Sequence, residues 1–130
     1  RKAGMSVTPE IADLLDERVM AHLATCRDGR PHAAPVWFVH DDGVVELITT
    51  GRKLANVRAN PRVALSIQKD TDGETEWTVT LLGTAEVVED EAATHEARRR
   101  INRKYGAPED AYSDNALVRV SVGTATHETY

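Results

Sequence analysis

The stretch VMAHLATCRDGRPHAAPVWFVHDDGVVELITT (residues 19–50) decides the fold class. Two Asp-Gly pairs, at residues 28–29 and 42–43, interrupt it, and Asp-Gly is one of the strongest short signals of a hairpin turn. The segments on either side of these turns are rich in Val, Ile, Thr and aromatic residues, which favour strands. Two turns joining three strands predict an antiparallel meander, with strands at residues 19–26, 31–40 and 44–50.

Three further strands follow. Gly83 lies in the middle of the longest one and predicts a bulge or bend there. In the last one Leu117 and Arg119 alternate with Val118 and Val120, as in a strand with one buried face. The predicted strands are residues 62–69, 75–89 and 116–126.

Three segments have the apolar spacing and the end residues of helices. Pro9 follows the capping residue Thr8, and Asp90 caps the longest segment. Asn60 ends the middle segment because a residue before proline resists the helical conformation. The predicted helices are residues 9–16, 51–60 and 90–104. Six antiparallel strands with short flanking helices predict a mainly β protein, a small β-barrel.

The composition fits one domain that spans residues 1–130, with 1–8 expected to be a flexible leader. The chain carries 16 Lys and Arg against 21 Asp and Glu, a net charge of −5. Nucleic acid is not an expected partner, because binding it requires a basic surface. No membrane partner is expected either, because no apolar run approaches the ~18–20 residues that span a bilayer.

Cys26 is the only cysteine. An intramolecular disulfide and a cysteine-based zinc site are therefore excluded, and a reducing, cytoplasmic setting is expected. The five histidines are scattered without the spacing of metal ligands, so no metal site is predicted.

One basic stretch stands out from the acidic total. Residues 51–62 contain four basic side chains and no carboxylate. A helix N-terminus with Arg52, Lys53 and the hydroxyls of Thr49 and Thr50 is able to hold a phosphate. The alternative is a solvated basic helix. Adjacent helical residues diverge by about 100°, so Arg52 and Lys53 need not face one ligand.

A second candidate lies at residues 35–38. Strand alternation places Pro35 and Trp37 on one face and Val36 and Phe38 on the other. Pro35 marks an edge, a bulge or a lapse in strand pairing, because proline has no backbone N–H to donate. An aromatic side chain beside unpaired backbone groups suits a planar ring with polar edges. The alternative is that both aromatic residues pack in the core.

With these two segments in place, the chain resembles the pyridoxamine 5′-phosphate oxidase-like superfamily, and more narrowly its small flavin- or deazaflavin-dependent oxidoreductases. The resemblance runs in order from residue 11 to residue 88. It is carried by Leu23-Ala24-Thr25, Asp28-Gly29-Arg30-Pro31, Pro35-Val36-Trp37-Phe38, Gly51-Arg52-Lys53, Asn56-Val57, Asn60-Pro61-Arg62-Val63-Ala64-Leu65 and Gly83-Thr84-Ala85. It implies a six-stranded split β-barrel and a homodimer whose subunits share a groove for FMN or the deazaflavin coenzyme F-420.

The resemblance also implies roles for individual residues. The strand at Pro35, Val36, Trp37 and Phe38 would line the ring system of the cofactor. The ribityl chain and phosphate would meet Thr49, Thr50, Lys53 and Asn56, with Arg52 as a second phosphate contact. Hydride transfer to a small-molecule substrate is the implied activity, and no catalytic acid or base is assigned. Oxidation of pyridoxamine phosphate is not expected, because the chain is short and lacks the additional basic and aromatic positions of the true oxidases.

The rival hypothesis is a binding module that holds flavin or haem for sensing, storage or carriage, with His32, His40 or His127 as an axial ligand. A third is a dimer that has lost its cofactor. Trp77 is expected in the core, and the basic cluster at residues 98–104 is expected to be a solvated helix face.

Overall fold

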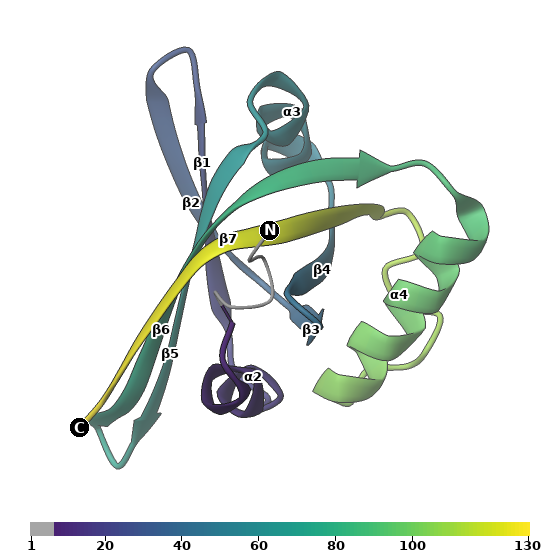
Figure 1. The fold of residues 1–130 in the computed structure, drawn as a ribbon. Coiled ribbons are helices and arrows are strands. Elements are labelled where there is room, and N and C mark those ends of the chain that lie inside the picture. Colours follow the sequence, from purple (N-terminus) through teal and green to yellow (C-terminus); the bar gives the residue numbers. More distant parts are fainter. Residues whose placement is uncertain (1–6) are drawn as a thin grey trace.

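The computed structural model describes residues 7–130 and contains one seven-stranded antiparallel sheet with three helices (Figure 1). The prediction of a mainly β fold with flanking helices is confirmed. In chain order the elements are α2 (Pro9–Leu15), β1 (Ala21–Arg27), β2 (Arg30–Val36), β3 (Phe38–Asp41), β4 (Val44–Thr49), α3 (Gly51–Ala59), β5 (Arg62–Thr71), β6 (Glu74–Val88), α4 (Glu91–Tyr105) and β7 (Ala116–Thr129).

The expected leader lies mostly outside the described residues. Of its last two residues, Val7 is buried and Thr8 accepts a hydrogen bond from the Ile11 N–H at the start of α2. These two residues therefore belong to the fold. Within the described part of the chain, no helix is long and apolar enough to cross a membrane.

The strand predicted at residues 31–40 is two strands, which is why the sheet has seven strands rather than six. β2 pairs with β1, whereas β3 pairs with β4, and the chain changes partner at Trp37. Both predicted hairpin turns form, but the meander is broken between them. Val36 and Phe38 on either side of the break are both buried, so the alternation of buried residues continues through it. The signal in the sequence is Pro35, which was expected at an edge or a lapse in pairing and lies in the edge strand β2, two residues before the break.

The strand order shows how the barrel closes. The order is β2-β1-β5-β6-β7-β4-β3, so β2 and β3 are the two ends of the sheet. They are joined through the single residue Trp37, which requires the sheet to curl round until its ends meet. β2 and β4 are not hydrogen-bonded neighbours, and this gap is the split of the barrel.

The core lies inside the curled sheet. Five strands contribute a fully or almost fully buried aliphatic side chain, and Ile11 and Leu15 of α2 join the same cluster. The strand contributions include Leu23, Leu47, Leu65, Leu81 and Val120. Trp77 is also buried here, as the sequence predicted.

Gly83 allows β6 and β7 to approach closely. The register between the two strands shifts between Leu82 and Gly83, which confirms the predicted irregularity. A Cβ atom at Gly83 would lie 2.5 Å from the Ser121 carbonyl oxygen, closer than van der Waals contact allows. The glycine is therefore required by the neighbouring backbone.

Helix α4 covers the outer face of β4 and β7 (Figure 1). Ile48 and its cross-strand neighbour Leu117 are buried on this face, as is Ile101 of α4. Beside them Glu46 is 8% exposed and bonds to Arg100 of α4 and Arg119 of β7. One carboxylate thus holds the helix and both strands together.

We predict that Glu46→Gln lowers the stability of the fold. The substitution removes one charge, leaves Arg119 without its carboxylate and leaves Arg100 with only the more distant Glu96, which costs about 1–3 kcal/mol. Urea unfolding measures the free energy. Glu109→Gln is the control, because Glu109 bonds to Arg103 at the surface, where solvent screens the pair. Equal stability of Glu46→Gln and wild type would contradict the role assigned to Glu46.

Candidate functional site

A groove of about 340 Å³ lies at the split of the barrel. One side comes from the end of β2 and the residue before β1, and the other from the end of β4 and the start of α3. The loop between α4 and β7 closes one end. The residues that line the groove are Met20, Pro35, Val36, Trp37, Ile48, Thr49, Thr50, Lys53, Tyr112 and Asn115.

Trp37 is fixed in this groove by two tyrosines. Its ring stacks on Tyr105 with centroids 4.7 Å apart and planes at 3°, and it meets Tyr112 edge-on at 5.6 Å. Aromatic pairs in these arrangements are favourable beyond the area they bury. The indole is therefore held in one orientation as part of the groove wall.

Tyr105 also supplies the hydrogen bonds that the broken ladder lacks. Its hydroxyl donates to the Val19 carbonyl oxygen (2.7 Å) and accepts from the Phe38 N–H (3.3 Å). Burial raises the pKa of Tyr105 to about 12, so the hydroxyl keeps the proton that it donates. The end of α4 thus bridges the entry to β1 and the start of β3.

Lys104 reinforces the same junction. Its Nζ donates to the carbonyl oxygens of Leu15 and Phe38 and lies 3.9 Å from the centroid of the Phe38 ring. Burial lowers the pKa of Lys104 to about 8. Because the amine is engaged with two carbonyl groups, we assign it to the structure and not to the groove.

The polar end of the groove is formed by Thr49, Thr50 and Lys53. Thr50 precedes α3 as its capping residue, yet its side chain makes no capping hydrogen bond. Gly51 has a φ of +69°, and nothing lies within 4 Å of the position where a Cβ would be. Within the described part of the chain Lys53 has no carboxylate partner. The Thr49 hydroxyl donates a long hydrogen bond to the Thr50 carbonyl oxygen (3.5 Å). At this end the groove therefore combines apolar and aromatic walls with one unpaired cation and two threonine hydroxyls.

The structure brings six of the nine predicted cofactor residues into this groove, namely Pro35, Val36, Trp37, Thr49, Thr50 and Lys53. Phe38 is not among them, because its side chain is fully buried in the core. Arg52 and Asn56 line a different hollow, beside the β1–β2 hairpin. Asn56 is also buried, and its amide donates to the Thr25 hydroxyl (3.0 Å), which ties α3 to β1.

Four groove residues were not predicted from the sequence: Met20, Ile48, Tyr112 and Asn115. Tyr112 is 52% exposed and is the one aromatic residue in a polar loop, which is a usable signal of a binding role. In the sequence, nothing distinguishes Ile48 and Met20 from other apolar residues of the predicted strands. Asn115 enters the groove only because its loop folds back over the split.

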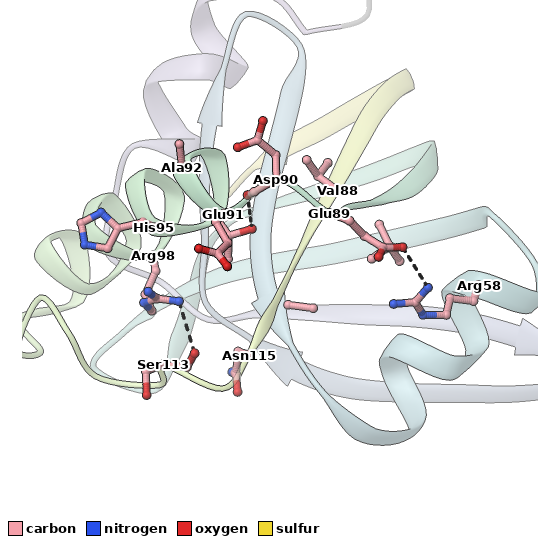
Figure 2. Close-up of a pocket in the computed structure, with 13 residues that line it drawn as sticks. Arg58, Val88, Glu89, Asp90, Glu91, Ala92, His95, Arg98, Ser113 and Asn115 are labelled. Carbon is pink, nitrogen blue, oxygen red and sulfur yellow. Dashed lines mark hydrogen bonds and ion pairs between the residues drawn. The ribbon is translucent and has the colours of Figure 1, made fainter.

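A larger hollow, of about 910 Å³, lies between the start of α4 and the end of β6 (Figure 2). Arg58 pairs with Glu89 at 3.5 Å, and Arg98 donates to the Ser113 carbonyl oxygen at 3.5 Å. Asp90 accepts from the Ala93 N–H and caps α4. Arg58 and Glu89 are thus paired with each other, and Asp90 and Arg98 are bonded to backbone groups, so this hollow offers a ligand less than the groove does.

The three histidines considered as haem ligands, His32, His40 and His127, have different contacts. His40 Nε2 accepts from the Gly43 N–H (3.0 Å), and His127 lies 3.4 Å from a Glu10 carboxylate oxygen. Burial lowers the pKa of His40 and favours the neutral form that accepts this bond. His32 lines the polar hollow beside the hairpin. Across residues 7–130 no group of three or more His, Cys, Asp or Glu is arranged to hold a metal ion.

The basic cluster at residues 98–104 is not simply a solvated face. Arg100 and Lys104 reach the sheet through Glu46 and the Phe38 carbonyl. Arg99 and Arg103 pair with Glu96 and Glu109 at the surface. The cluster therefore attaches α4 to the barrel and leaves few free cations.

The comparisons with known proteins agree on a family. A family model described as pyridoxamine 5′-phosphate oxidase matches residues 7–128. A protein described as an F420 reductase is 28% identical with a TM-score of 0.73, covering 88% of this chain and 94% of that one. A conserved hypothetical protein from Mycobacterium tuberculosis is also 28% identical, with a TM-score of 0.80 and coverage of 92% and 82%.

The haem storage protein HutZ from Vibrio cholerae is 21% identical with a TM-score of 0.76, covering 96% of this chain and 95% of that one, so it shares the fold. No curated protein matches the chain.

We predict that Tyr105→Phe destabilises the fold and loosens Trp37. Loss of the hydroxyl leaves the Val19 carbonyl and the Phe38 N–H without their partner, at a cost of about 1–3 kcal/mol. Urea unfolding gives the free energy, and near-UV circular dichroism reports the packing of the indole. Tyr112→Phe is the matched control, because its hydroxyl has no partner in the described part of the chain. Similar losses of stability in both variants would show that the two hydrogen bonds of the Tyr105 hydroxyl do not account for the effect.

Proposed function

The chain belongs to the pyridoxamine 5′-phosphate oxidase family, and from that premise we propose that it is an oxidoreductase that binds FMN or coenzyme F-420 in the groove between β2 and β4. One observation carries the proposal: the only described lysine or arginine on the groove wall, Lys53, is unpaired and lies beside two threonine hydroxyls. A phosphate-bearing ring cofactor needs both a flat apolar surface and such a polar end.

The residues present fit a flavin-type group. The groove volume of about 340 Å³ falls within the roughly 300–1,000 Å³ of small-molecule sites. Val36, Ile48 and Met20 supply apolar surface, and Trp37 is already fixed by its stack on Tyr105. The hydroxyl of Thr50 is uncommitted because it does not cap α3.

The bound cofactor would supply the hydride chemistry. The protein's own residues would bind and orient it. Lys53 would neutralise the phosphate, Thr49 and Thr50 would hydrogen bond to the polar chain, and the wall at residues 35–37 would fix the plane of the ring and exclude water from one face. No groove residue is assigned as a catalytic acid or base.

Of the two cofactors, the deazaflavin has support from the relative described as an F420 reductase, which is 28% identical over most of both chains. Oxidation of pyridoxamine phosphate is not proposed, because the groove wall, as formed by residues 7–130, carries a single lysine and no arginine. A second phosphate-bearing ligand would lack a cation of its own there. We therefore propose a small-molecule substrate without a phosphate of its own.

We also propose that the working unit is a homodimer. The outer surface of the sheet from β2 to β7 through β1, β5 and β6 carries a shallow apolar hollow of about 590 Å³, lined in part by Ala24, Pro31, Ala64 and Leu82. Leu82 is 50% exposed, an unusual position for a large apolar side chain on a strand. A second copy seated here would cover this surface and extend the wall of the groove.

We predict that Lys53→Gln weakens cofactor binding roughly tenfold to a hundredfold, because a charge-assisted hydrogen bond to phosphate is worth about 1.5–3 kcal/mol. Titration of purified protein with FMN and with F-420, followed by absorbance, gives both affinities and identifies the preferred cofactor. Arg58→Gln is the control, since it removes a cation from the same helix outside the groove. Absence of binding by either cofactor to wild type, or a haem Soret band in the purified protein, would refute the proposal.

We predict that Leu82→Glu shifts the protein from dimer to monomer, because a buried unpaired carboxylate opposes association. Sedimentation at micromolar concentration measures the change, and an unaltered far-UV spectrum shows that the fold remains. A monomeric wild type under the same conditions would exclude the shared-groove arrangement.

A further inference from the structure

Asn102 is a fully buried polar side chain in the last turn of α4, and it does not line the groove. Its amide Nδ2 donates to two carbonyl oxygens, those of Glu109 (3.2 Å) and Ala111 (2.9 Å). Both belong to the loop between α4 and β7, residues 106–115. A side chain inside the helix thus holds the backbone of the segment that follows it.

Asparagine is an unfavourable residue for this position in the helix. It is a weak helix former, and Asn102 Oδ1 is buried with no hydrogen-bond partner in the described part of the chain. An alanine would form the helix better and would bring no polar side-chain atom into the core. What the asparagine contributes is therefore its two donor bonds, and both go to the loop.

The loop runs back along α4 towards the groove (Figure 1). Its residues Glu109 and Ala111 lie against Asn102, and two residues further on the Ser113 carbonyl oxygen accepts from Arg98, one turn earlier in the helix (3.5 Å). Of these loop contacts, the two from Asn102 come from a side chain with no exposed surface. Asn102 is therefore the buried anchor of the loop.

Tyr112 follows the anchored Ala111 directly and has a φ of +63°. A bulky residue is rarely found in this left-handed conformation, which persists only where the surrounding structure fixes it. The Ala111 N–H donates to the Pro108 carbonyl oxygen (3.0 Å). The Asn115 N–H donates to the Tyr112 carbonyl oxygen (3.1 Å). The backbone is thus fixed on both sides, and the Tyr112 ring meets Trp37 edge-on in the groove.

We infer that Asn102 is a positioning residue of the groove, which fixes the loop so that Tyr112 forms part of the groove wall before a ligand binds. Asn102 touches no ligand itself and acts through Tyr112. A wall that is already ordered spares the ligand the entropy of ordering it. The inference rests on the proposed function, since the ligand is the ring of FMN or F-420.

The first test uses the wild-type protein without a cofactor. ¹⁵N relaxation is expected to give backbone order parameters of about 0.85 for the amides between residues 107 and 115, the value of rigid backbone. Values below about 0.6 would show that the loop is flexible before a ligand binds, and would overturn the inference.

The second test is Asn102→Ala, again without a cofactor. The order parameters of the loop are expected to fall, and acrylamide quenching of tryptophan fluorescence is expected to rise. Trp77 is 2% exposed and Trp37 is the only other tryptophan, so the change in quenching reports on Trp37. Unchanged order and quenching would contradict the role of Asn102.

Glu109→Gln is the matched control for this test. It removes the surface bond to Arg103 but keeps the carbonyl group that accepts from Asn102, so it should behave as wild type does. Far-UV circular dichroism checks the fold of each variant. Asn102→Leu, which also lacks a donor but fills the space with apolar atoms, replaces Asn102→Ala if the alanine variant does not fold.

A double-mutant cycle then separates positioning from general stability. Asn102→Ala is expected to weaken FMN or F-420 binding roughly twofold to tenfold, the range of one aromatic contact. Tyr112→Asn removes the ring, and asparagine tolerates the left-handed backbone. In the Tyr112→Asn background, Asn102→Ala should cause no further loss of affinity, although it should still lower the free energy of unfolding.

Equal losses of affinity with and without the Tyr112 ring would overturn the inference. If wild type binds neither cofactor, the proposed function fails, whereas the order parameters and the quenching still decide whether Asn102 positions Tyr112. The two failures are therefore distinguishable.

Discussion

The rest of the structure depends on one change of strand partner at Trp37. The two ends of the sheet, β2 and β3, are consecutive in the chain with a single residue between them. The barrel is therefore closed by a covalent link and not by a hydrogen-bonded ladder. This closure leaves a gap between β2 and β4, and the gap is the groove. The hydroxyl of Tyr105 pairs backbone groups at this junction, while its ring fixes the indole that forms the groove wall.

The described lysines and arginines fall into two groups: those bonded to other groups of the protein and those left without a partner. Arg100 and Arg119 share Glu46, Lys69 pairs with Glu17, and Lys104 is bonded to carbonyl groups. Within residues 7–130, the cations without a carboxylate or carbonyl partner lie on α3, at the hairpin tip and at the start of β5, at one end of the barrel. Leaving charges unpaired there contributes nothing to folding, which is why this end of the molecule is where an anionic ligand is expected.

Most of the architecture was predictable because its signals are local. Asp-Gly turns, the cap at Asp90 and the alternation of Leu117 with Val118 depend only on neighbouring residues. In the strand predicted at residues 31–40, Pro35 indicated an edge or a lapse in pairing, but the change of partner at Trp37 was not predictable, because inward residues continue on both sides of it. The same limit applies to the site. The sequence grouped Phe38 and Asn56 with the cofactor residues but did not indicate that the Phe38 side chain lies in the core or that the Asn56 amide bonds to Thr25. Their roles toward a cofactor stay predictions.

The sequence by itself determined the elements, the two hairpins and a carboxylate-free basic stretch, since turn chemistry, periodicity and composition are properties of short segments. Only the tertiary structure decided which side chains face one another. It placed Tyr105 and Tyr112, more than 60 residues away, against Trp37. It also placed Lys53 in the groove and Arg52 in the hollow beside the β1–β2 hairpin, which Arg30 lines as well. Those relations arise from the curling of the sheet round a single connecting residue, and no local pattern encodes the distance between segments that are far apart in the chain.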